Sequence, residues 1–111
     1  MTKIERQIEI KAPVEDVFNY TQDWRNYALF YAGIYEWRPA TERVTGKGAR
    51  FAYKAKALGK EFEVETEVID EVVNSSRSFA SVTGARTRGQ WLFEPSPGGT
   101  KVTYRAEYEL P

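Results

Sequence analysis

The sequence predicts one α+β domain, in which a strand and two short helices precede a run of about six strands. Polar and apolar residues alternate with the period of a strand over residues 3–11 and again after Gly33, and they take helical spacing in between. The 111 residues have the length of a single domain, and they contain no internal repeat, linker or low-complexity segment.

The first strand is expected over residues 3–11. Ile4, Ile8 and Ile10 share one face of it, and Arg6 is the charged exception on that face. An unpaired charge on an apolar face is costly. Arg6 is therefore either an anchor for the polar end of a ligand or, as we favour, an arginine that reaches water near the end of the strand.

Two helices are expected next. Pro13 suits the first turn of a helix, and the apolar residues that follow it lie at helical spacing. A second, shorter helix is predicted over residues 24–31, with Asp23 as its N-cap and Gly33 after its end.

The later strands follow one another with short turns between them. Tyr35 and Trp37 are expected on one face of the first, and the segments 51–57 and 61–68 are expected to pair as a hairpin across a turn at residues 58–60. One face of that hairpin carries Lys54, Lys56, Glu61, Glu63, Glu65 and Glu67, and we interpret it as a solvent-facing row rather than a metal site.

Three more strands are predicted over residues 78–83, 86–93 and 102–110, the last two joined by a loop at residues 95–99. In the first of them the apolar residues fall on both faces, so the sequence leaves its orientation open. In the second, Arg86 and Arg88 share the face opposite Trp91.

The composition excludes several classes of chemistry. The chain has no His and no Cys, so nucleophile–histidine pairs, disulfides and His- or Cys-ligated metals are impossible. Its 16 basic and 16 acidic residues balance, which argues against binding to nucleic acid. No apolar run is long enough for a membrane span or a signal peptide. We expect a cytoplasmic protein without a metal or cofactor.

Four segments carry a recognisable pattern: the strand-to-helix junction at residues 8–18, the stretch from Thr21 to Tyr27, the glycine-rich hairpin start at residues 46–51, and the final hairpin with its strands at residues 91–95 and 98–104. In this order and spacing they resemble the START-related, Bet v 1-like (SRPBCC) superfamily, and within it the polyketide cyclase/dehydrase-like group. Tyr27 stands where the family usually has Trp.

The resemblance implies a helix-grip fold, in which a curved antiparallel sheet of about seven strands surrounds a long C-terminal helix. The cavity between sheet and helix holds a hydrophobic ligand in such proteins. This sequence stops at Pro111, so we expect a single domain over residues 1–111 that is truncated after the last strand and lacks that helix. A helix outside this sequence, a partner's helix or face-to-face dimerisation are the three ways in which the apolar sheet face could be covered.

The candidate ligand-binding residues are the aromatic side chains expected on the concave face, although the same residues could simply form the core. Tyr hydroxyls and arginines are the polar groups left for such a site. Arg77, Arg86 and Arg88 could form a small patch that binds an anionic ligand or a phosphate, although a solvated strand face is the favoured interpretation. No catalytic residue is assigned. The candidates are Phe30, Tyr35, Trp37, Phe51, Tyr53, Phe62, Trp91, Phe93 and Tyr104, with Tyr31 also on this face.

Three functions remain open from the sequence. The first is binding or transport of a hydrophobic small molecule such as a lipid, quinone or polyketide. The second is a cyclase/dehydrase-like enzyme, in which a shaped cavity folds a reactive substrate. The third is an interaction module that completes its fold by homodimerisation or with a partner's helix.

Overall fold

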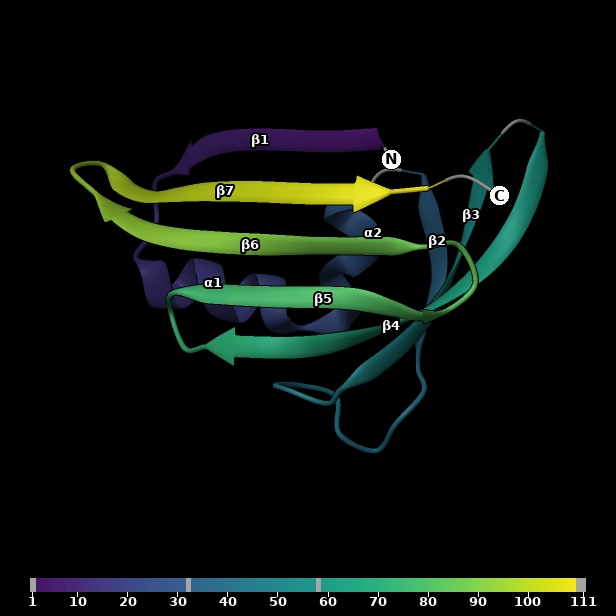
Figure 1. The fold of residues 1–111 in the computed structure, drawn as a ribbon. Helices are drawn as coiled ribbons and strands as arrows, with labels where there is room; N and C mark the ends of the chain where they lie inside the picture. The colour runs from purple at the N-terminus through teal and green to yellow at the C-terminus, as the bar shows by residue number, and fades with distance from the viewer. Residues whose placement is uncertain (1, 32, 58, 110–111) are drawn as a thin grey trace.

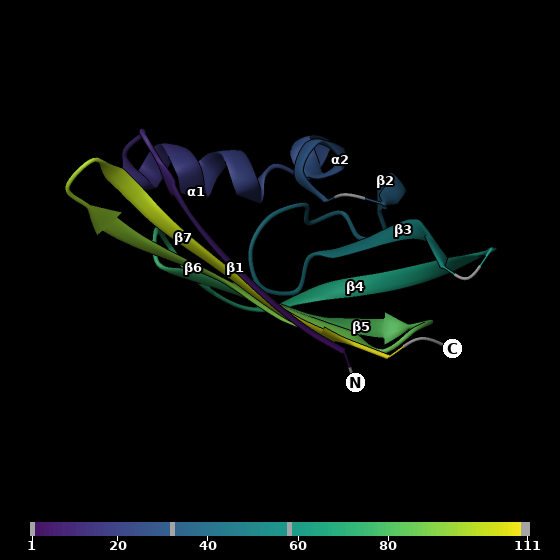
Figure 2. The same cartoon turned by 90° about the horizontal axis from the view of Figure 1, so that it is seen from above.

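Seven antiparallel strands form one curved sheet, and two short α-helices lie over its concave side (Figures 1 and 2). This is a computed structural model, and it describes residues 2–31, 33–57 and 59–109. The elements are β1 (Thr2–Ile10), α1 (Val14–Gln22), the 3-10 helix η1 (Trp24–Asn26), α2 (Tyr27–Phe30), β2 (Ile34–Pro39), β3 (Arg50–Ala57), β4 (Lys60–Val72), β5 (Ser76–Thr83), β6 (Thr87–Ser96) and β7 (Gly99–Tyr108).

The strand order in the sheet is β1-β7-β6-β5-β4-β3-β2. Strands β2 to β7 therefore follow one another as a meander, and β1 returns to pair with β7. This arrangement confirms the predicted α+β class, the seven strands and the two helices after β1. In the part of the chain that the structure describes, no long helix follows β7. Leu58 in the predicted turn, and Leu110 at the predicted end of the last strand, lie outside the described residues.

The apolar face predicted for β1 is buried only in part. Ile4 and Ile10 are partly buried, whereas Ile8 is 58% exposed. The reason is that β1 is an edge strand, and α1 packs against β6 and β7 instead. Arg6 is exposed, as expected of an arginine that reaches water, and its Nη1 donates to the carbonyl of Glu5 at 2.9 Å.

The helices begin where the sequence predicts. Helix α1 follows Pro13, and it buries Val17, Phe18 and Thr21. Asp23 is a side-chain cap, because its Oδ1 accepts from the backbone N–H of Arg25 at 3.0 Å. The predicted second helix is divided into η1 and the single turn of α2.

The core consists of two clusters on the concave side. In the first, α1 places Phe18 edge-on to Phe93 of β6, with 5.4 Å between the ring centroids. In the second, Tyr27 of α2 packs on Phe51 of β3. Both strand residues lie on the predicted faces. The two clusters anchor α1 and α2 at different places along the sheet, and the cavity described below opens beside the second.

A β-bulge in β2 changes which residues of that strand face inward. Glu36 has a positive φ of 55°, and the pairing with β3 shifts between Tyr35 and Arg38. Trp37 consequently packs on Tyr53, while the Tyr35 hydroxyl hydrogen-bonds to Glu61. The expectation that Tyr35 and Trp37 share a face is therefore wrong, because the extra residue reverses the alternation.

The glutamate row of β4 lies on the same face as the lysines of β3, as predicted. Lys54 pairs in register with Glu63, and Lys56 with Glu61. Arg50 contributes as well, with 2.6 Å between its Nε and Oε1 of Glu67. These partly exposed pairs fix the register of the sheet more than they stabilise it.

Candidate ligand-binding cavity

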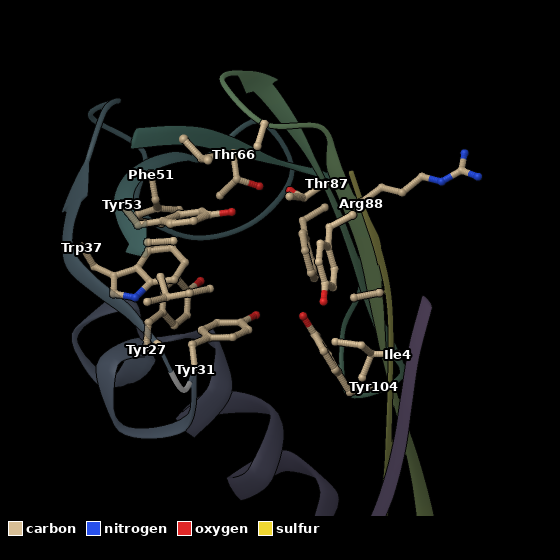
Figure 3. A pocket seen from close by; sticks show the side chains of 18 of the residues that line it. Ile4, Tyr27, Tyr31, Trp37, Phe51, Tyr53, Thr66, Thr87, Arg88 and Tyr104 are labelled. Atoms are coloured by element: carbon tan, nitrogen blue, oxygen red, sulfur yellow. The ribbon is translucent and has the colours of Figure 1, made fainter. Parts of the chain in front are cut away.

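A cavity of about 470 Å³ lies between the concave face of the sheet and α2. Figure 3 shows that its walls come from elements far apart in the sequence: Tyr31 follows α2, Trp37 belongs to β2, Tyr53 to β3 and Tyr104 to β7. The curvature of the sheet brings these side chains to face one another. The cavity is thus enclosed mainly by aromatic rings, with polar groups at a few positions.

The sequence-predicted residues divide into three groups. Trp91 and Phe93 point to the concave side but pack in the core beside the cavity, since Trp91 contacts Tyr31 and Phe93 contacts Phe18. Tyr35 lies on the opposite face of the sheet, as described above. The predicted residues that line the cavity are Phe30, Trp37, Phe51, Tyr53, Phe62 and Tyr104.

Tyr31 and Trp37 form the centre of the aromatic wall. Their rings are stacked with 5.3 Å between centroids, and Trp37 also lies 4.5 Å from the ring of Tyr53. The Tyr31 hydroxyl accepts a hydrogen bond of 2.8 Å from Nε1 of Trp91. These contacts hold the ring planes in place, so the wall is formed before any ligand arrives.

Three tyrosine hydroxyls point into the cavity. Those of Tyr31, Tyr53 and Tyr104 converge on the open space from different walls (Figure 3). Burial raises the pKa of Tyr104 to about 12, and it raises the pKa of Tyr31 well above its usual value. All these phenols are therefore neutral at physiological pH and can donate hydrogen bonds.

Trp37 contributes a further polar atom to the wall. Its Nε1 is buried and makes no hydrogen bond with the described residues. Buried polar groups are normally satisfied. A ligand with oxygen atoms in this space would supply hydrogen-bond acceptors for the hydroxyls of Tyr53 and Tyr104.

Arg77 of β5 lies at the inner end of the cavity, and only 4% of it is exposed. Its Nε donates to Oε2 of Glu71 at 2.8 Å, and its Nη1 donates to Oγ1 of Thr21 at 3.1 Å. Its guanidinium carbon lies 4.7 Å from the centroid of the Phe18 ring. The arginine thus links α1 to the sheet.

The three arginines considered as a patch for an anionic ligand do not gather into one. Arg88 points away from the cavity and pairs with Glu107 at 2.8 Å, and Arg86 is an exposed side chain near Glu109 (Figure 3). For these two the favoured interpretation, a solvated strand face, is correct. Arg77 is the exception, because β5 directs it inward.

Sequence reasoning did not assign Tyr27, Arg77, Phe79 or Thr87 to the cavity that they line. The pairing of β4 with β5 shifts twice. Val82 of β5 is the extra residue at the first shift and Ile69 of β4 is the extra residue at the second, and together they decide that Phe79 faces inward. The Phe79 ring lies over Gly89, where an added Cβ would be 2.5 Å from its Cζ and 2.8 Å from the carbonyl oxygen of Arg105. In the sequence, the glycine at residue 89 was the feature that could have indicated that Phe79 faces inward.

Neither a metal cluster nor a membrane-spanning helix is found within residues 2–31, 33–57 and 59–109. No group of three or more Asp and Glu side chains there is arranged to hold an ion. None of the helices there is long and apolar enough to cross a membrane.

A family model described as polyketide cyclase / dehydrase and lipid transport matches residues 1–111. The chain belongs to this family. Membership in the polyketide cyclase / dehydrase and lipid transport family confirms the resemblance drawn from the sequence motifs. A search of curated proteins found no match.

Solved structures show the same fold as this member of the polyketide cyclase / dehydrase and lipid transport family. A protein from Deinococcus radiodurans is similar with a TM-score of 0.80 and 22% identity, over 100% of this chain and 85% of that one. A protein from Thermus thermophilus has a TM-score of 0.78 and 26% identity, over 99% and 75%. The di-domain ARO/CYC StfQ from the steffimycin biosynthetic pathway has a TM-score of 0.76 and 12% identity, over 98% and 37%.

Proposed function

We propose that the chain binds, and carries, a hydrophobic small molecule in the cavity over the concave face of its sheet. A lipid, a quinone and a polyketide-like compound are the candidate ligands. The observation that carries this proposal is the cavity itself, which at about 470 Å³ has the size of a small-molecule site. The family description, which includes lipid transport, supports it.

The composition of the wall fits this role. Rings such as Trp37, Phe51 and Phe62 would remove apolar ligand surface from water, which contributes about 25 cal/mol per Å². The hydroxyls of Tyr53 and Tyr104 would orient the ligand by hydrogen bonds. Because contacts between the rings already fix the side chains of the wall, little side-chain conformational entropy is lost when a ligand binds.

A fluorescence titration with the uncharged dye N-phenylnaphthylamine tests this proposal. We expect saturable binding of one dye per chain. Ala55 and Ala106 both line the cavity, so the separate variants Ala55→Trp and Ala106→Trp should each weaken the affinity by about tenfold or more by filling space.

The matched control is Ala80→Trp. Ala80 pairs in register with Arg88 and Glu67, which puts it on the convex face, so this variant should bind the dye as the wild type does. Equal affinity in all three variants, with their folds intact by circular dichroism, would place the dye elsewhere and contradict the proposal.

A cyclase/dehydrase-like enzyme is the second candidate, and the convergence of phenols from Tyr31, Tyr53 and Tyr104 favours it. Neutral phenols can hydrogen-bond to substrate carbonyls and stabilise an enolate as it forms. Turnover of a poly-β-keto substrate that Tyr104→Phe abolishes, while dye binding persists, would distinguish catalysis from carriage.

An interaction module remains the third candidate, because Ile8 is exposed at the edge of the concave face. The mass in solution would reveal a homodimer, and a partner's helix over this face would appear as a heteromeric complex. A cytoplasmic location, and the lack of binding to nucleic acid, also remain predictions.

A further inference from the structure

The inner end of the cavity offers hydrogen-bond donors. A guanidinium has five N–H groups. Three of those of Arg77 are engaged, with Glu71, with Thr21 and, at 3.4 Å, with the carbonyl of Phe18. The other two make no hydrogen bond with the described residues, and Arg77 lines the cavity.

The positive charge of Arg77 is already balanced. Glu71 lies behind it, outside the cavity lining, with an exposed side-chain fraction of 8%. Gln22 holds that carboxylate through a second hydrogen bond, from Nε2 to Oε1 at 3.0 Å. A ligand beside Arg77 therefore meets an ion pair with no net charge, and it gains little from a charge of its own.

The rest of the wall disfavours an anion. Tyr27 and Tyr104 have pKa values raised to about 12, and in both cases burial is the largest cause. The desolvation that disfavours a phenolate at these positions also disfavours a carboxylate or sulfonate of a ligand that is buried beside them. Of the other cations that line the cavity, Arg88 is paired with Glu107, and Lys56 lies opposite Glu61 in the register of β3 and β4.

We infer that the cavity selects uncharged hydrophobic molecules that carry oxygen acceptors, such as ketones, quinones or alcohols, and that it rejects carboxylates and other anions of the same shape. This inference rests on the proposed function, because it specifies the ligand class of the same cavity. The balanced Arg77–Glu71 pair is its basis: the donors recognise an oxygen atom, and the carboxylate behind them removes the preference for negative charge.

The test compares two dyes with the same aromatic skeleton. N-phenylnaphthylamine is uncharged, and anilinonaphthalene sulfonate adds one sulfonate. We expect the wild-type chain to bind the uncharged dye about tenfold or more tightly, which corresponds to about 1.4 kcal/mol. Displacement of the uncharged dye by dodecanol and by dodecanoate should show the same preference for the alcohol.

A variant of Glu71 then tests whether the Arg77–Glu71 pair causes this selectivity. Glu71→Gln leaves the Arg77 charge unbalanced, so the affinity for the sulfonated dye should rise by about tenfold or more while that for the uncharged dye changes little. Glu63→Gln is the matched control, because it makes the same substitution in the exposed pair with Arg38. It should leave the ratio of the two affinities unchanged.

The outcomes separate the two proposals. If neither dye binds the wild type, both the proposed function and this inference fail. If the two dyes, or the alcohol and the carboxylate, bind equally well, the inference is overturned and the binding function stands. A folded Glu71→Gln chain with an unchanged ratio also overturns it. If Glu71→Gln does not fold, the wild-type comparison of dodecanol with dodecanoate decides alone.

Discussion

At the scale of single residues, Arg77 and Glu71 depend on each other. Their side chains are 5% and 8% exposed, and neither charge has access to water that could replace its partner. The Arg77→Met variant leaves Glu71 charged and buried, so the free energy of unfolding should fall by about 3–5 kcal/mol. Urea unfolding followed by circular dichroism measures this loss.

An exposed pair provides the control for this prediction. Arg88 bonds to Glu107 with 67% of its side chain exposed, and Arg88→Met should change stability by about 1 kcal/mol or less. Equal losses in the two variants would show that the inner pair is hydrated and would contradict its assignment as buried.

The contrast between these arginines also shows what sequence reasoning could predict. Alternation correctly assigned Arg88 to the face opposite Trp91, and it correctly placed Phe51 and Tyr53 inward. It could not place Arg77, because the apolar residues that follow it fall on both faces of β5.

At the scale of the element, the bulge in β2 is held by one unusual backbone conformation. Glu36 has a φ of 55°, which a β-branched residue adopts only with strain and glycine adopts freely. Glu36→Val should therefore be less stable than Glu36→Gly by about 1–3 kcal/mol in urea unfolding.

The two variants are compared with each other because either substitution also removes an ion pair. Both lose the pair between Glu36 and Lys54, so the difference between them reports the backbone alone. Equal stabilities would indicate that β2 can pair with β3 without the bulge. The same bulge explains the incorrect assignment of Tyr35, because an irregularity of one residue leaves no mark on a pattern of alternation.

The order of elements was predictable because each depends on local signals. Pro13, Asp23 and the glycine-rich turns mark where strands and helices begin or end, and their order defines the meander. The cavity was only partly predictable, since its shape depends on how far the sheet curls and on how one bulge in β4 and one in β5 set the register of these two strands.

At the scale of the whole molecule, the buried tyrosines should determine stability in alkali. Burial raises the pKa of Tyr27 and of Tyr104 from 10.0 to about 12 in the folded chain. The unfolded chain therefore loses these protons first. Their contribution to stability is fully present below pH 10 and is lost as the pH rises from 10 to about 12.

Urea midpoints measured across this pH range, together with tyrosinate absorbance, test the prediction. The Tyr104→Phe variant should show a smaller decline with pH than the wild type. Tyr20→Phe should decline as the wild type does, because the Tyr20 ring is 47% exposed. If the buried tyrosines ionise in the folded chain with no loss of stability, the prediction fails.

Gly89 helps to determine the width of the cavity, although Gly89 is not among the residues that line this cavity. Phe79 can lie flat along the wall because residue 89 has only hydrogen where other residues have a methyl group. A related chain with alanine there must move that ring and also shift the strand that carries the Arg105 carbonyl. The volume of the cavity is thus set partly by a residue that does not line it.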